Sequence, residues 1–179
     1  MQAAFDKNYF EIFGLPESFR LDLTDVTKRY RDLQQQLHPD RYASASDQDR
    51  RLSVQMAAQV NEAFQTLKDP VRRGRYLLAL KGIDTGEESD TAMNPAFLME
   101  QMELREALET VRDSDNALAE LGALETEVID AFDARIIRLQ TCFDSDGNED
   151  LKVARETVRE LQFLQKIRGE IEQIEEELV

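Results

Sequence analysis

Apolar residues recur every three or four positions along most of the chain, which is the period of an α-helix with one buried face. In the first eighty residues the pattern predicts a short helix ending at Gly14 and two long helices that pair as an antiparallel hairpin. Asp22 and either Ser46 or Asp47 can cap the long helices, and Pro70 suits the first position of a further short helix. The apolar positions of the two long helices are Leu23, Val26, Tyr30, Leu33 and Leu37, and then Met56, Val60, Ala63, Phe64 and Leu67.

The second half of the chain predicts three more helices, approximately over residues 95–112, 115–143 and 150–178. A break of the middle helix near Gly122 is an alternative. Residues 81–94 are rich in Gly, Asp, Thr, Glu and Ser and lack sustained periodicity, so we interpret them as a linker. The predicted fold is all-α, with a helical hairpin domain over residues 1–80 and a three-helix bundle over residues 95–179.

Composition narrows the class of protein. The single cysteine, Cys142, excludes an internal disulfide framework, and one cysteine with one histidine cannot complete a four-ligand zinc site, so no metal or cofactor is predicted. The N-terminus has the character of neither a signal peptide nor a transit peptide, and no apolar stretch approaches the roughly 20 residues that span a bilayer. We expect a cytoplasmic protein that does not enter the membrane, with a processed organellar form as the alternative.

The net charge of −15 is distributed unevenly along the chain. Residues 1–80 contain 12 Lys and Arg against 11 Asp and Glu, a net charge of +1, whereas the remainder contains 10 against 26, a net charge of −16. This acidic surplus disfavours nucleic acid as a partner, because binding to phosphates needs clustered Lys and Arg. The asymmetry indicates two units with different partners.

The tripeptide His38-Pro39-Asp40 stands between the two long helices of the predicted hairpin. Pro39 disfavours helical backbone at His38, so the first helix should end at Leu37 and the tripeptide should form an exposed loop. Asp40 offers a carboxylate that an arginine of a partner could grip, and His38 offers ring nitrogens that donate or accept near neutral pH. The simpler alternative is a helix stop with a solvated histidine.

Positive charge lies on the helix that leads into this tripeptide. At 100° per residue, Lys28 and Arg31 share a polar stripe with Thr24 and Gln35, and Arg29 lies beside it. An ordinary solvated helix face is the alternative for the stripe alone. Together with the tripeptide it indicates a binding surface.

The helix that starts at Pro95 carries more apolar residues than one buried stripe requires. Its core face contains Phe97, Leu104, Leu108 and Val111. Leu98, Met99 and Met102 project from roughly the opposite side, with Glu103 and Glu106 beside them, which is typical of a protein-docking site. Packing of these side chains on the linker or the first domain is the alternative. Phe163 raises a similar question, because it lies away from the apolar stripe of the last helix.

Neither catalysis nor calcium binding is favoured by the sequence. His38 and Asp40 could act as an acid–base pair, but the chain lacks a second histidine, a reactive-cysteine context, a metal cluster and a glycine-rich phosphate loop. Residues 144–148 are similar to the start of a calcium-binding loop. The glutamate expected later in such a loop is missing and the apolar pattern resumes at Leu151, so we predict a plain turn.

The first part of the chain resembles the J-domain over about residues 5–80. The segments that carry the resemblance are Lys28-Arg29-Tyr30-Arg31, His38-Pro39-Asp40-Arg41, Asn61-Glu62-Ala63-Phe64 and Leu67-Lys68-Asp69-Pro70. Arg41 stands where lysine is frequent, which keeps the charge, and Asp32 stands where another basic residue is often found, which weakens the basic face slightly.

The rest of the chain resembles the C-terminal domain of HscB-type, or Jac-type, J-domain co-chaperones of iron–sulfur cluster assembly. The segments that carry this resemblance are residues 97–106 and 161–164. It implies a non-enzymatic protein whose J-domain stimulates ATP hydrolysis by an HscA/DnaK-type heat-shock chaperone and whose C-terminal helices bind the iron–sulfur scaffold protein IscU. A J-domain co-chaperone for a different client is the alternative.

The resemblance also implies roles for individual residues at both ends of the molecule. The residues expected to contact the chaperone are Lys28, Arg29, Arg31, His38, Pro39 and Asp40. The residues expected to contact the scaffold are Leu98, Met99, Met102, Glu103, Glu106 and Phe163.

Overall fold

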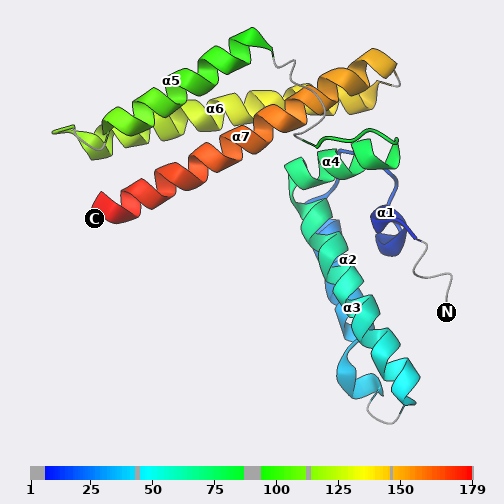
Figure 1. Cartoon of the computed structure of the whole chain (residues 1–179). Coiled ribbons are helices and arrows are strands. Elements are labelled where there is room, and N and C mark those ends of the chain that lie inside the picture. The colour runs from blue at the N-terminus through cyan, green and yellow to red at the C-terminus, as the bar shows by residue number, and fades with distance from the viewer. Residues whose placement is uncertain (1–6, 43–44, 87–93, 112–113, 146, 179) are drawn as a thin grey trace. The chain divides into compact units, whose positions relative to one another are not determined.

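The computed structural model describes residues 7–42, 45–86, 94–111, 114–145 and 147–178 (Figure 1). All regular structure in these ranges is helical, which confirms the predicted all-α class. The chain divides into two compact units, residues 1–77 and 78–179, with the division inside the helix α4 (Pro70–Leu80). Much of the predicted linker, residues 87–93, lies outside the described ranges. Among the described residues, no helix combines the length and the apolar character needed to cross a membrane.

The first unit opens with the short helix α1 (Tyr9–Phe13), whose two ends are both fixed by local contacts. The side chains of Asn8 and Glu11 form a capping box at its start. It ends at Gly14, as the sequence predicted, in a left-handed conformation with φ of 60° that favours glycine. Phe10 and Phe13 of this helix are buried, and the ring of Tyr9 stacks on that of Tyr76.

Two long helices, α2 (Leu23–Gln36) and α3 (Asp47–Lys68), form the predicted hairpin and run side by side in Figure 1. Asp22 caps α2, and Ser46 rather than Asp47 caps α3. Two aromatic rings join the helices directly, because Tyr30 stacks on Phe64 with 3.9 Å between ring centroids. The core between and around the helices contains Phe19, Val26, Leu37, Val60, Ala63, Phe64 and Leu67.

The prediction that Leu23 belongs to the core is wrong, because this residue is 45% exposed. It is the first residue of α2, and Phe19 in the preceding segment is buried instead.

The prediction of a helix that begins at Pro70 is confirmed, since Pro70 is the first residue of α4 and the Asp69 carboxylate accepts from the N–H groups of Val71 and Arg72. Burial lowers the pKa of the nearby Arg73 guanidinium, although the charge of Asp69 opposes this shift.

The second unit consists of α5 (Pro95–Val111), α6 (Ala117–Asp144) and α7 (Asn148–Leu178). α6 and α7 pack along each other, and Gly122 does not break α6. The predicted end of the first of these helices, at residue 112, lies outside the described ranges. The buried apolar residues of this core include Phe97, Leu104, Leu108, Val111, Leu121, Leu124, Val128, Leu139, Cys142, Ala154, Val158, Leu161, Leu164, Ile167, Ile171 and Ile174. Burial raises the pKa of the Cys142 thiol.

Arg135 on α6 links all three helices of the second unit. Its guanidinium Nε donates to Glu160 on α7 at 2.7 Å, and a second nitrogen pairs with Glu100 on α5. The guanidinium carbon of Arg135 lies over the Phe97 ring, 5.6 Å from its centre. Glu160 is buried, so this pairing holds its charge inside the unit and fixes α5 against the α6–α7 pair.

We predict that Arg135→Ala lowers the free energy of unfolding by about 3–5 kcal/mol, because it leaves the buried Glu160 carboxylate without its close partner. Arg138→Ala is the matched control. Arg138 is half-exposed and lies 3.5 Å from Glu160, so its loss should lower the free energy of unfolding by about 1 kcal/mol or less. Urea denaturation followed by circular dichroism measures both changes. Equal losses in the two variants would contradict the proposed importance of the three-helix link.

Candidate functional site

The His38-Pro39-Asp40 segment is ordered as a turn of 3-10 helix, η2 (Pro39–Tyr42), directly after α2. The sequence predicted an exposed loop, and the exposure is confirmed at both polar side chains. The His38 side chain is 60% exposed and that of Asp40 is 92% exposed. The sequence did not predict the helical turn. The turn is closed by the backbone N–H of Arg41, which donates to the His38 carbonyl at 3.0 Å.

Short contacts join His38 to Asp40 within this turn. The backbone N–H of Asp40 donates to the His38 ring nitrogen Nδ1 at 3.3 Å. The Asp40 carboxylate oxygen Oδ2 lies 3.5 Å from the same nitrogen. Arg41 also reaches back to α2, where it donates to the Gln35 carbonyl at 3.5 Å. The turn therefore presents the Asp40 carboxylate outward while His38 contacts its backbone.

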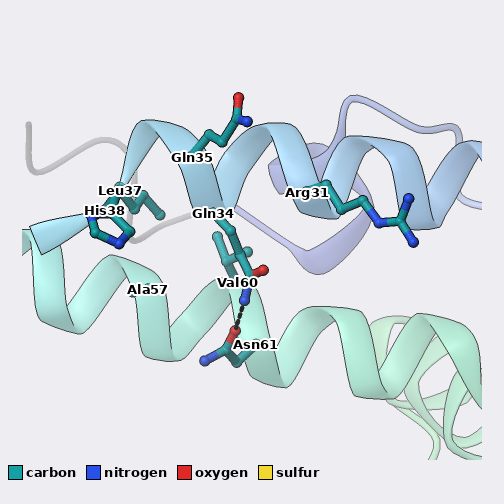
Figure 2. A pocket seen from close by; sticks show the side chains of 8 residues that line it. All are labelled: Arg31, Gln34, Gln35, Leu37, His38, Ala57, Val60 and Asn61. Atoms are coloured by element: carbon teal, nitrogen blue, oxygen red, sulfur yellow. Dashed lines mark hydrogen bonds between the residues drawn. The ribbon is translucent and has the colours of Figure 1, made fainter.

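A groove of about 520 Å³ lies between α2 and α3 next to His38 (Figure 2). Leu37 and Val60 are buried at its base. Gln34 and Asn61 face each other across it and are joined by a hydrogen bond of 3.5 Å, while both also bond to the Tyr30 hydroxyl. The described residues that line it are Arg31, Gln34, Gln35, Leu37, His38, Ala57, Val60 and Asn61. Sequence reasoning missed the amide pair, since Asn61 meets α2 only once the hairpin has closed.

The three predicted basic residues of α2 differ in their surroundings. Lys28 and Arg31 are exposed. Arg29 instead forms an ion pair with Asp25 at 2.8 Å and donates to the carbonyls of Phe13 and Gly14 at 3.0 and 3.2 Å. Its guanidinium thus joins α2 to the end of α1, and the structure gives it a role in holding the first unit together.

The apolar face predicted on α5 is exposed in the second unit. The exposed fractions of Leu98, Met99 and Met102 are 42%, 63% and 71%. Glu103 and Glu106 are exposed on the following turns of the same helix. The opposite side of α5 is buried as predicted, so the core of this unit does not use the three apolar side chains. We call Leu98, Met99, Met102, Glu103 and Glu106 the α5 patch.

Phe163 on α7 is half-buried and packs against α5. Its ring meets that of Phe97 edge to face, with 5.6 Å between centroids. The Arg105 guanidinium carbon lies over the Phe163 ring, 5.7 Å from its centroid. Phe163 is therefore part of the seam between α5 and α7, which explains why it falls outside the main apolar stripe of α7.

Comparison with known proteins identifies both halves of the chain. A model described as the DnaJ domain matches residues 8–76, and one described as the HSCB C-terminal oligomerisation domain matches residues 93–172. A co-chaperone protein HscB homolog of Paraburkholderia phymatum is 45% identical over 169 residues, 94% of this chain and 94% of that protein. The chain belongs to the HscB family.

Solved structures of HscB proteins have the same fold. The chaperone HscB from Vibrio cholerae superposes with a TM-score of 0.85 at 42% sequence identity, covering 97% of this chain and 100% of that one. The human co-chaperone protein HscB superposes with a TM-score of 0.86 at 28% identity, covering 95% of this chain and 83% of that one. The J-domain and the HscB-type C-terminal domain predicted from sequence are thus confirmed.

The placement of Arg29 in this HscB-family chain gives a prediction that separates it from its neighbour Lys28. Arg29→Ala should lower the free energy of unfolding by about 1–3 kcal/mol, because two carbonyls and the Asp25 carboxylate lose their donor. Lys28→Ala, which removes the same charge from an exposed site, should change it by no more than about 0.5 kcal/mol. Urea denaturation compares the two variants. A negligible effect of Arg29→Ala would show that the α1–α2 contact contributes little to stability.

Proposed function

We propose that this HscB-family chain is a cytoplasmic co-chaperone that brings an IscU-type iron–sulfur scaffold protein to an HscA/DnaK-type chaperone and stimulates ATP hydrolysis by that chaperone. The observation that carries the proposal is the 92% exposed carboxylate of Asp40, held in an ordered turn at the end of a helical hairpin. The curated relatives are named co-chaperones, and the proposed chemistry takes place in the partner rather than in this chain.

The chaperone-binding end consists of the turn η2 and the exposed cations of α2. A carboxylate can accept two parallel hydrogen bonds from an arginine, so Asp40 suits an arginine that becomes repositioned in the chaperone. Lys28 and Arg31 would steer the approach to an acidic surface and raise the rate of association. Arg29 belongs to this end only indirectly, because its guanidinium is engaged within the first unit.

The scaffold-binding end is the α5 patch with Phe163 beside it. Leu98, Met99 and Met102 offer flexible apolar contacts, and a thioether side chain adapts readily to a partner surface. Glu103 and Glu106 would select a partner with basic residues next to its apolar contact. Phe163 is only half-buried, so it can present part of its ring while it packs on Phe97.

We predict that Asp40→Asn reduces stimulation of the chaperone's ATPase by at least about tenfold, because the variant loses a charge-assisted pair with an arginine. The steady-state rate of ATP hydrolysis by the purified chaperone is the measurement. Asp32→Asn is the matched control, since it removes one exposed carboxylate from the same unit and should leave stimulation unchanged or slightly raised. Undiminished stimulation by folded Asp40→Asn would contradict the proposed role of Asp40 in engaging the chaperone.

We also predict that the Leu98/Met99/Met102→Ala triple variant binds the scaffold protein at least about tenfold more weakly, because it loses most of the apolar area of the α5 patch. Calorimetry or pull-down with the purified scaffold measures this. Leu118/Ile137→Ala is the control, because both residues are exposed apolar side chains on α6. Equal binding by the triple variant and wild type, with ATPase stimulation retained, would point to a J-domain co-chaperone for a different client.

A further inference from the structure

The turn that carries Asp40 has an unusual residue at its N-terminal end. The first N–H groups of any helix lack acceptors within the helix, and a Ser, Thr, Asp or Asn side chain commonly accepts one of them. At η2 this position is occupied by His38. Its carbonyl accepts the N–H of Arg41 at 3.0 Å, and its ring nitrogen Nδ1 accepts the N–H of Asp40 at 3.3 Å. The imidazole therefore serves as the N-terminal cap of η2.

This cap depends on the protonation state of the ring. A nitrogen that accepts a hydrogen bond must hold a lone pair, so the neutral ring carries its proton on Nε2. A protonated imidazole has a donor at both nitrogens and no acceptor. Uptake of a proton by His38 must therefore break the hydrogen bond from the Asp40 N–H.

The Asp40 carboxylate is placed to respond to the same proton. Its Oδ2 lies 3.5 Å from Nδ1, so a small movement would make a charge-assisted hydrogen bond once Nδ1 carries hydrogen. In the neutral state the same two atoms are both acceptors and have no reason to pair. The carboxylate is then available to a partner.

The other groups around the ring do not offer a competing carboxylate. Arg31 on α2 lines the same groove, and Arg41 donates to the Gln35 carbonyl. α3 contributes only Ala57, Val60 and Asn61 to the described lining, and none of these titrates. Of the described residues, Asp40 is the one whose carboxylate pairs with His38.

We propose that His38 is a positioning residue for Asp40, which caps η2 as a neutral ring and, when protonated, draws the Asp40 carboxylate onto itself and away from an arginine of the chaperone. The proposal rests on the proposed function and adds a control by pH to it. Proton uptake by the chain would weaken its engagement with the chaperone.

Nuclear magnetic resonance tests the cap in the full chain without any partner. His38 is the only histidine, so its ring signals are unambiguous. At about pH 8 the ¹⁵N shifts should show hydrogen on Nε2, and once the ring signals report protonation as the pH is lowered toward about 5.5, the Asp40 amide proton should shift and exchange faster. A proton on Nδ1 at pH 8, or an Asp40 amide that does not respond, would overturn the cap.

The matched control for this measurement is His38→Asn. The asparagine oxygen accepts a hydrogen bond at either pH, so the Asp40 amide signal should no longer respond. A response of the same size in this variant would assign the change to another group and would also overturn the proposal.

Stimulation of a purified HscA/DnaK-type chaperone tests the consequence. Relative to the chaperone's own basal hydrolysis at each pH, the concentration of wild-type chain needed for half-maximal stimulation should be about two- to fivefold higher at pH 5.5 than at pH 8, the size expected of one exposed ion pair. Equal values at the two pH values would reject the control by pH while leaving the proposed function intact. An absence of stimulation at both would instead reject the proposed function, and the resonance data would still decide the cap.

Discussion

A helix at the surface of its unit has one side without neighbours in that unit, and α5 shows the consequence. α5 buries Phe97 and Leu104, so Leu98, Met99 and Met102 on its other side have no place in the core. Complete burial of such a side chain is worth about 1.5–3 kcal/mol relative to full exposure, and the isolated unit gains only part of this at Leu98, Met99 and Met102, which are 42%, 63% and 71% exposed. A partner that covered the α5 patch would recover part of the remaining free energy.

Two arginines show how the surroundings, rather than the residue type, decide what a charge does. Arg135 meets two carboxylates from neighbouring helices and becomes part of the interior of the second unit. Arg29 meets Asp25 and two carbonyls at the end of α1 and becomes part of the first. Lys28 and Arg31 have no such role in the described contacts within the fold, so they remain accessible for long-range steering.

The helices, most of their caps and both candidate surfaces could be predicted from the sequence, because periodicity and capping are local. Predictions were incomplete where a third element intervenes. Asp25 and Arg29 are four residues apart and their pairing is a local signal, but the carbonyls of Phe13 and Gly14 come from another helix. Phe163 similarly departs from the stripe of α7 because α5 brings Phe97 to it. The apolar periodicity of a single helix predicts the face that meets its main neighbour, but it does not predict contacts with a second neighbouring helix.

The turn η2 combines exposure with order, and the hairpin explains how. Its own contacts are few and solvent-accessible, so each contributes little to stability. The order comes from both sides, because Leu37 is buried just before the turn and Ser46 caps α3 just after residues 43–44. The chain is thus held by a buried residue before the turn and by a helix cap after it, while the side chains within the turn are held by weak contacts. Such a turn can exchange its weak internal contacts for those of a partner at low cost.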